Sequence, residues 1–136
     1  MKLLGLSLLF FSTCAFASPG PELQKAIEEG KKLYSQETFG GNGKTCNTCH
    51  VNGGVGPGKL PDGRAIPSLE NAAAIFPRYN QRAKKIYTLT DQIHACVHGG
   101  LQGNPPALDS ERLVDLVSYV TSLSQGKALD MDGKPN

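Results

Sequence analysis

Residues 46 to 50 read Cys-Asn-Thr-Cys-His, and this motif constrains the fold more than any other part of the 136-residue chain. Two thiols three positions apart can add across the two vinyl groups of a haem, and a histidine directly after them can reach the iron as an axial ligand. A chain that holds such a group must wrap itself around a large planar hydrophobe. The sequence therefore predicts haem c held covalently by Cys46 and Cys49, with His50 as the proximal iron ligand.

Two other chemistries use a C-x-x-C pair. A thiol–disulfide site is usually set between a strand and a helix, and no strand pattern precedes Cys46. A zinc site would need two further ligands, for which Cys96 and His98 are the candidates. The histidine that ends the motif and the glycine-rich residues around it favour haem over both alternatives. Because the motif occurs once, we expect one haem.

The first 17 residues have the layout of an export signal. A lysine precedes an apolar run over residues 3–11, and a small-residue A-x-A pattern ends at Ala17. This predicts a signal peptide over residues 1–17 and a single mature domain over residues 18–136 in the periplasm. The apolar run is shorter than the roughly 20 residues that span a bilayer, so a retained anchor is the weaker interpretation. We expect no membrane span in the mature chain.

The charge of the chain narrows the range of partners. The formal net charge is +2 at pH 7, which is too small to attract nucleic acid or anionic lipid strongly. No nucleic-acid partner is expected. Four cations gather in one stretch, at Arg78, Arg82, Lys84 and Lys85. A solvated surface is the first interpretation of this stretch, and contact with haem propionates or with a redox partner is the second.

Apolar residues recur at helical spacing near both ends of the mature chain. One pattern predicts a helix over residues 21–35, and a stronger one predicts a helix from about residue 110 to Gly126. Gly30 lies inside the first helix, where glycine costs about 1 kcal/mol relative to alanine. That cost makes sense if another element approaches the backbone closely, and Tyr119 of the last helix is the candidate. The alternative is that the first helix breaks at Gly30.

The chain between these helices is irregular. The glycine-rich residues 36–68 predict a loop wrapped around a site, and a short helix is expected before Pro77. A capping box before residue 89 and two glycines after residue 98 predict a helix over residues 89–98. No segment alternates long enough for a strand, so the predicted fold is all-α. Terminal helices that cross at a glycine–aromatic contact resemble the core of the class I cytochrome c fold, which predicts a cytochrome c domain over residues 18–136.

The second iron ligand has two candidates in the mature chain. Met131 lies in a polar tail beyond the last helix, and the tail would have to fold back to bring it to the iron. Cys96 shares one face of its helix with Leu89 and Ile93, whereas the two histidines of that helix point elsewhere. Cys96 is also the one thiol without an assigned partner. A buried inert thiol or an intermolecular disulfide stays open for it.

Residues 67–127 resemble the haem domains of the A subunit of the Sox thiosulfate-oxidising cytochrome and of periplasmic thiosulfate dehydrogenases. The matching motifs are F-P-x-Y from Phe76 to Tyr79, T-L-x-x-x-I-x-x-C from Thr88 to Cys96, the turn from Leu101 to Asn104, and Y-x-x-S-L-S-x-G from Tyr119 to Gly126. The resemblance implies that Cys96 is the distal thiolate ligand of the haem. The sequence departs from the family at Gln92, where an arginine is common.

The resemblance also implies a function. We expect a periplasmic cytochrome that transfers single electrons in sulfur-compound (thiosulfate) oxidation, with a redox partner protein or a sulfur-oxidation enzyme subunit as its partner. The rival is a catalytic subunit that binds or oxidises thiosulfate at a Cys96-ligated iron, with the cations of residues 78–85 as anion contacts. Ligand sensing at an open iron site is a third interpretation. Because Gln92 removes a cation and the family enzymes usually bring a second haem domain or a partner subunit, we favour the carrier and assign no catalytic residue.

Overall fold

The computed structural model describes residues 18–136, so the expected signal peptide over residues 1–17 lies outside the described residues. The described chain forms five α-helices: α1 Pro21–Gln36, α2 Cys46–Cys49, α3 Ala72–Ile75, α4 Leu89–Gly99 and α5 Glu111–Ser122. A 3-10 turn, η1, covers Asn52–Gly54. Four short strands complete the fold: β1 Gly58–Lys59, β2 Ala65–Ile66, β3 Arg78–Asn80 and β4 Lys85–Tyr87. Over residues 18–136, we find no helix with the length and apolar character needed to cross a membrane.

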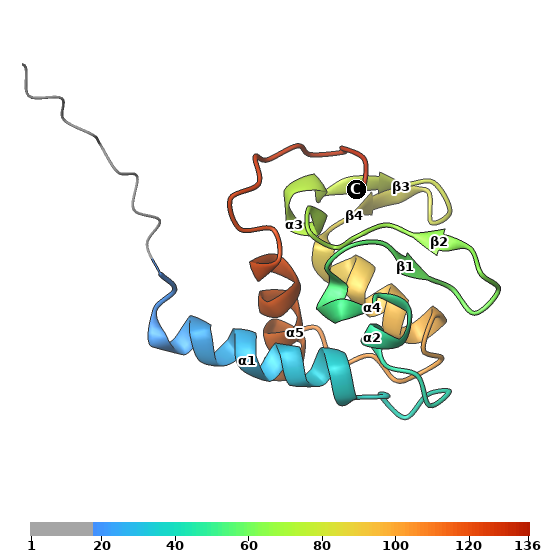
Figure 1. Cartoon of the computed structure of the whole chain (residues 1–136), viewed down its shortest axis with the longest axis horizontal. Helices are drawn as coiled ribbons and strands as arrows, with labels where there is room; N and C mark the ends of the chain where they lie inside the picture. Colours follow the sequence, from blue (N-terminus) through green and yellow to red (C-terminus); the bar gives the residue numbers. More distant parts are fainter. Residues whose placement is uncertain (1–17) are drawn as a thin grey trace, which may run out of the picture.

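Helices α1 and α5 cross at Gly30 (Figure 1). A Cβ atom on Gly30 would collide with the backbone carbonyl of Asp115 and would come within 2.8 Å of the Tyr119 Cβ. Only a residue without a side chain lets the two backbones approach this closely. The predicted crossing at a glycine–aromatic contact is therefore confirmed, and α1 continues through Gly30 without a break.

Helix α4 begins at the capping box that the sequence predicts. The Thr88 hydroxyl accepts a hydrogen bond from the Asp91 backbone N–H at 3.1 Å, and the Asp91 carboxylate accepts one from the Thr88 backbone N–H at 2.9 Å. Each side chain thus satisfies a backbone donor that the helix leaves open. Helix α5 begins in a similar way at Ser110, whose hydroxyl accepts a bond from the Leu113 N–H at 3.3 Å. It ends at Ser122, before the predicted end at Gly126.

The all-α prediction is incomplete, because β1–β2 and β3–β4 form two antiparallel hairpins. Strands β3 and β4 pair Arg78 with Tyr87 and Asn80 with Lys85. The Asn80 side-chain oxygen closes the turn by accepting hydrogen bonds from the backbone N–H groups of Arg82 and Ala83 at 3.0 and 2.9 Å. Strands of two or three residues are too short to show a period of two, which is why the sequence pattern did not reveal them.

The C-terminal tail returns across α3 towards the β3–β4 hairpin (Figure 1). The Asp130 backbone N–H donates to the carbonyl of Ala74 at 2.8 Å. Farther along, the carbonyl of Asn136 accepts a bond from the Ser68 N–H at 3.0 Å, and Asn71 donates to the carbonyl of Lys134 at 2.9 Å. These bonds join the end of the chain to α3 and to the segment just before it.

The core lies between the crossing helices and α4. Its largest fully buried side chains are Tyr34, Leu113, Leu116 and Val97. The rings of Tyr34 and Tyr119 meet edge to face with their centroids 5.1 Å apart. Their hydroxyls reach the loop after α2, where Tyr34 donates to the carbonyl of His50 at 2.6 Å and Tyr119 donates to the carbonyl of Gly53 at 2.8 Å. The crossing thereby holds the loop that carries the histidine of the motif.

Candidate functional site

Helix α2 is one turn that presents the two cysteines of the motif. The Thr45 backbone N–H donates to the Thr48 hydroxyl at 3.0 Å, which closes the N-terminal end of the turn. At the other end the His50 N–H donates to the carbonyl of Cys46 at 3.0 Å. Residues three apart lie on one side of a helix, so Cys46 and Cys49 project together directly before His50. Both cysteines are free thiols.

An apolar space, which we call the inner cavity, lies between α2 and α4. Cys46 and His50 form part of one wall, and Cys96 forms part of the other. Most of the remaining lining is hydrophobic and includes Tyr34, Leu69, Phe76, Ile93, Leu116 and Val120. Cys49 does not belong to the lining. The fold thus brings three of the four predicted haem-site residues to one cavity, with the fourth in the same turn as two of them.

The environment of His50 favours an uncharged imidazole. Burial lowers its pKa below the ordinary value, and the nearby carbonyl of Pro67 opposes this shift only in part. Its Nδ1 atom is buried and makes no hydrogen bond of normal geometry within the described chain. A metal-binding histidine must be deprotonated at the ligating nitrogen, so this environment prepares His50 to act as a ligand.

Cys96 lies one turn before the end of α4, where its sulfur accepts a hydrogen bond from the Gln92 side-chain amide at 3.2 Å. Burial raises the pKa of Cys96, and this hydrogen bond opposes the shift. Although protein atoms surround the side chain densely, water can still reach it. The reason is that Cys96 lines both the inner cavity and a second space, the outer cleft, whose other lining residues include Asn80, Arg82 and Tyr87.

The sulfurs of Cys46 and Cys96 influence each other. Burial raises the pKa of Cys46 to about 12, and the charge that Cys96 would carry as a thiolate adds to this rise. Both groups are therefore neutral thiols when no cation is near them. A buried thiolate becomes favourable when it binds a positive centre. The raised pKa values therefore favour a neutral thiol at both Cys46 and Cys96 in the absence of a bound cation.

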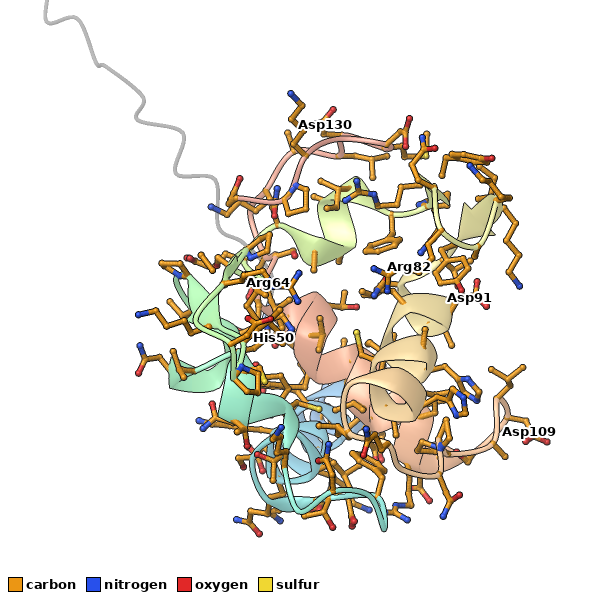
Figure 2. The ribbon with its side chains drawn as sticks, turned by 90° about the vertical axis from the view of Figure 1, so that its right-hand side faces the viewer. His50, Arg64, Arg82, Asp91, Asp109 and Asp130 are labelled. Atoms are coloured by element: carbon orange, nitrogen blue, oxygen red, sulfur yellow. The ribbon has the colours of Figure 1, made fainter. Side chains whose placement is uncertain are left out.

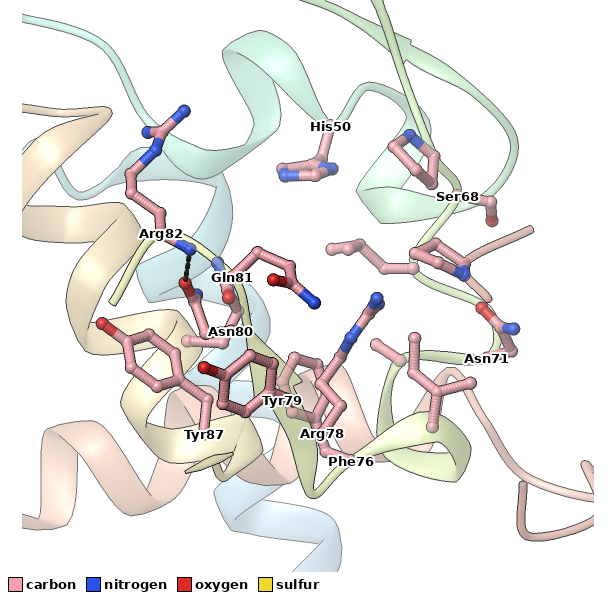
Figure 3. Close-up of a pocket in the computed structure, with 16 residues that line it drawn as sticks. His50, Ser68, Asn71, Phe76, Arg78, Tyr79, Asn80, Gln81, Arg82 and Tyr87 are labelled. Atoms are coloured by element: carbon pink, nitrogen blue, oxygen red, sulfur yellow. Dashed lines mark hydrogen bonds between the residues drawn. The ribbon is translucent and has the colours of Figure 1, made fainter. Parts of the chain in front are cut away.

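The basic stretch divides between the site and the surface. Arg78 and Arg82 line a space beside His50, which we call the arginine cleft, together with Asn80, Gln81 and Tyr87. Their side chains extend from the β3–β4 hairpin towards the wall that carries His50 (Figure 3). In a side view, Arg82 lies beside the start of α4 and His50 at the end of α2 (Figure 2). Lys84 and Lys85 do not belong to this lining, and the Lys85 ammonium lies 5.5 Å from the centre of the Tyr87 ring.

Met131 does not reach the cavity, although its tail does fold back. The side chain is 59% exposed and is absent from the lining of the inner cavity and of both clefts. The geometry therefore favours Cys96 over Met131 as the second ligand. The zinc alternative also loses support, since residues 18–136 contain no cluster of three or more His, Cys, Asp or Glu side chains placed to bind a metal ion.

These residues fit a covalently bound haem. The inner cavity offers apolar walls, the Cys46 thiol and a half-buried imidazole whose pKa is lowered, and the Cys49 thiol lies in the same helical turn as Cys46. The arginine cleft shares His50, Phe76 and Gln92 with it and offers cations, as a macrocycle with an apolar body and carboxylate substituents requires. Sequence reasoning missed this division into an apolar and a cationic part. It also missed the Gln92–Cys96 bond, which the four-residue spacing on a predicted helix could have revealed.

Known proteins provide an independent comparison. A model of the SoxA/TsdA cytochrome c domain matches residues 29–129. Thiosulfate dehydrogenase of Allochromatium vinosum is 32% identical over 115 residues, which cover 79% of this chain and 41% of that protein. The L-cysteine S-thiosulfotransferase subunit SoxA of Pseudaminobacter salicylatoxidans is 29% identical over 118 residues, which cover 87% of this chain and 36% of that one.

A solved structure shows the same fold. SoxXA from P. pantotrophus superposes with a TM-score of 0.63 at 21% sequence identity, over 82% of this chain and 37% of that chain. The chain thus spans less than half the length of the relatives it matches. The fold is that of a cytochrome c domain with five helices and two small hairpins in the described residues, and cytochrome c domains bind haem c. With the match to the family model covering most of its length, the chain belongs to the SoxA/TsdA cytochrome c domain family.

Proposed function

We propose that this chain is an exported cytochrome that passes single electrons through one covalently held haem during sulfur-compound oxidation. The observation that carries the proposal is the meeting of Cys46, His50 and Cys96 around one apolar cavity. Export to the periplasm is part of the proposal and rests on the signal-like pattern of residues 1–17. A redox partner protein, or an enzyme subunit of sulfur oxidation, would deliver or accept the electron.

Each residue of the site has a separate task. Cys46 and Cys49 would form the two thioether bonds, His50 would ligate the iron from one side and Cys96 from the other. When bound, the haem would supply a reversible one-electron couple between ferric and ferrous iron. The Tyr34 hydroxyl fixes the backbone of His50 through its 2.6 Å hydrogen bond, and the hydrophobic walls exclude water from the ligands.

The single motif favours a carrier over an enzyme. Oxidative coupling of two thiosulfates releases two electrons, and one haem stores one, so each electron would have to leave before the next could be accepted. The sequence contains one C-x-x-C-H. Gln92, moreover, is neutral where the family commonly has arginine, which leaves less positive charge beside Cys96 for a dianion.

One observation favours the enzyme as a second candidate. The outer cleft reaches Cys96 from the solvent side and includes the cation Arg82. A small sulfur anion could therefore approach the sulfur of Cys96 without passing through the inner cavity. If the chain is catalytic, this cleft is the place where thiosulfate would bind.

Ligation is tested by replacing Cys96 with methionine in protein matured by a c-type assembly system. A thiolate donates electron density and stabilises ferric iron, so Cys96→Met should raise the midpoint potential and change the low-spin paramagnetic resonance signal. Met131→Ala is the matched control and should leave both unchanged. The opposite pattern, with Met131→Ala altering the spectrum and Cys96→Ala leaving it intact, would show that Cys96 is not the ligand.

The choice between carrier and enzyme needs a turnover assay. Purified holoprotein is mixed with thiosulfate and an excess of artificial acceptor, beside a thiosulfate dehydrogenase as positive control. We expect rapid electron exchange with the acceptor and little or no thiosulfate oxidation. Sustained turnover that disappears in Cys96→Ala would overturn the carrier and establish the enzyme. Intact mass first verifies one haem per chain, and a mass equal to the bare polypeptide would refute covalent attachment.

A further inference from the structure

Gln92 occupies a special position on α4. It lies four residues before Cys96, on the same face of the helix, and its Nε2 donates the 3.2 Å hydrogen bond to the Cys96 sulfur. Among the described residues, this is the one side-chain hydrogen bond to that sulfur. Gln92 also lines the inner cavity, the arginine cleft and the outer cleft. Its amide therefore lies where all three spaces meet, beside the predicted ligand.

A hydrogen bond to a thiolate changes what the sulfur donates. The donor stabilises negative charge on the sulfur, so the sulfur gives less electron density to a bound iron. Hydrogen bonds to ligand sulfurs are among the means by which proteins set the potentials of metal centres. A glutamine amide acts in this way without adding a charge, whereas an arginine at the same position would add a cation.

We propose that Gln92 is a positioning residue that holds the Cys96 sulfur towards the inner cavity and, through its hydrogen bond, raises the potential of the His50/Cys96 centre. This inference deepens the proposed electron-carrier function and rests on the ligation by Cys96 that it assumes. A thiolate ligand lowers the potential, and the hydrogen bond from Gln92 makes this lowering smaller. The glutamine amide does so without adding a charge to the site. Residue 92 thus helps to set the potential for electron exchange. Because it is glutamine and not arginine, it also adds no cation that would bind an anionic substrate.

The test uses holoprotein carrying Gln92→Leu, which keeps the size of the side chain and removes the donor. The midpoint potential should fall below that of the wild type, and the low-spin signal should shift towards that of a stronger thiolate donor. Gln92→Glu should lower the potential further. A carboxylate donates no hydrogen bond to the sulfur, and its negative charge stabilises the ferric state. Gln92→Lys, which restores a donor, should bring the potential back to the wild-type value or above it.

Gln24→Leu is the matched control. Gln24 lies on α1, where its amide donates to the Glu28 carboxylate at 3.1 Å with the same four-residue spacing. Its replacement removes an equivalent bond away from the cavity and should leave the potential unchanged. Gln92→Asn, which is too short to reach the sulfur, provides a second variant if the leucine variant folds poorly, and it should also lower the potential.

The outcomes separate this inference from the proposed function. If the wild type lacks a thiolate-type spectrum, both the ligation by Cys96 and the role of Gln92 are wrong. If the wild type has that spectrum, but Gln92→Leu and Gln92→Asn match Gln24→Leu in potential and signal, the ligation stands and the role of Gln92 is refuted. A fall in potential for both variants, reversed in Gln92→Lys, supports the inference.

Discussion

Where α1 crosses α5, two backbones touch at Gly30 with no side chain between them; where α4 faces α2, the inner cavity separates the helices. The first region is stabilised by contacts that the polypeptide makes with itself. The second has apolar walls that face open space and three thiols that have no disulfide partner. The difference indicates that the polypeptide itself closes the crossing, whereas α4 packs Val97 into the core on one face and borders a space open to a bound group on another.

The largest expected effect is that of haem attachment on the α4 side. Protein made without c-type maturation, or as Cys46→Ala/Cys49→Ala, should lose the part of its far-ultraviolet helical signal that comes from α4, because the cavity loses its central hydrophobe. Hydrogen exchange should show that residual protection lies in α1 and α5, while α4 exchanges freely. Equal protection in all three helices of the haem-free protein would contradict the division into two regions.

The next effect concerns the crossing. Gly30→Ala places a methyl group against the Asp115 carbonyl and the Tyr119 side chain. Overpacking of this kind costs about 3 kcal/mol, and the better helix propensity of alanine returns about 1 kcal/mol. We therefore expect the free energy of unfolding of the holoprotein to fall by about 2 kcal/mol in denaturant titrations. Gly20→Ala, with no atom within 4 Å of the added group, is the control and should change little.

The smallest effect concerns the start of α4 and depends on pH. The Thr88 side chain and backbone donate to the Asp91 carboxylate and hold its pKa below the ordinary value of 3.8. Since the folded-state pKa lies below the unfolded one, the stabilisation is present above about pH 4 and is lost as the pH falls through the folded-state value. Asp91→Asn should therefore lower stability at pH 7 by less than the roughly 1 kcal/mol of a whole cap.

Unfolding titrations at pH 7 and pH 3 check this prediction. The difference between the wild type and Asp91→Asn should shrink in acid, whereas Asp109→Asn, an exposed acidic residue before α5, should show no such change. A difference that stays constant over this range would mean that the carboxylate does not act through its charge.

Local signals allowed much of the fold and part of the site to be predicted. Gly30 and Tyr119 predicted the crossing because a glycine inside a helical pattern needs a structural reason, and Thr88 predicted the start of α4 because a cap involves neighbours in sequence. Cys96 was favoured over Met131 by its helix face, and the structure places its side chain in the cavity wall. The roles of the site residues as ligands stay predictions.

The parts that escaped prediction depend on distant segments. The tail returns because backbone groups near Asp130 and Asn136 bond to residues about 60 positions earlier, and no local pattern encodes such a pairing. The β3–β4 hairpin closes through Asn80 and is too short for periodicity to show. The arginine cleft forms only when that hairpin packs beside His50. The sequence alone therefore could not show that Arg78 and Arg82 line the cleft while Lys84 and Lys85 do not.

The return of the tail determines how the molecule can be attached to a surface. Pro135 forms part of the arginine cleft, and Asn136 is bonded to Ser68 and Asn71. A linker added after Asn136 would leave the domain beside that cleft, whereas the start of α1 lies far from the C-terminal end (Figure 1). On an electrode, a film of protein tethered through the carboxyl end would turn the cleft towards the electrode surface. A film of protein tethered ahead of Gly20 would leave the cleft open to soluble proteins. Voltammetry of the two films would therefore sample opposite faces of the same cytochrome.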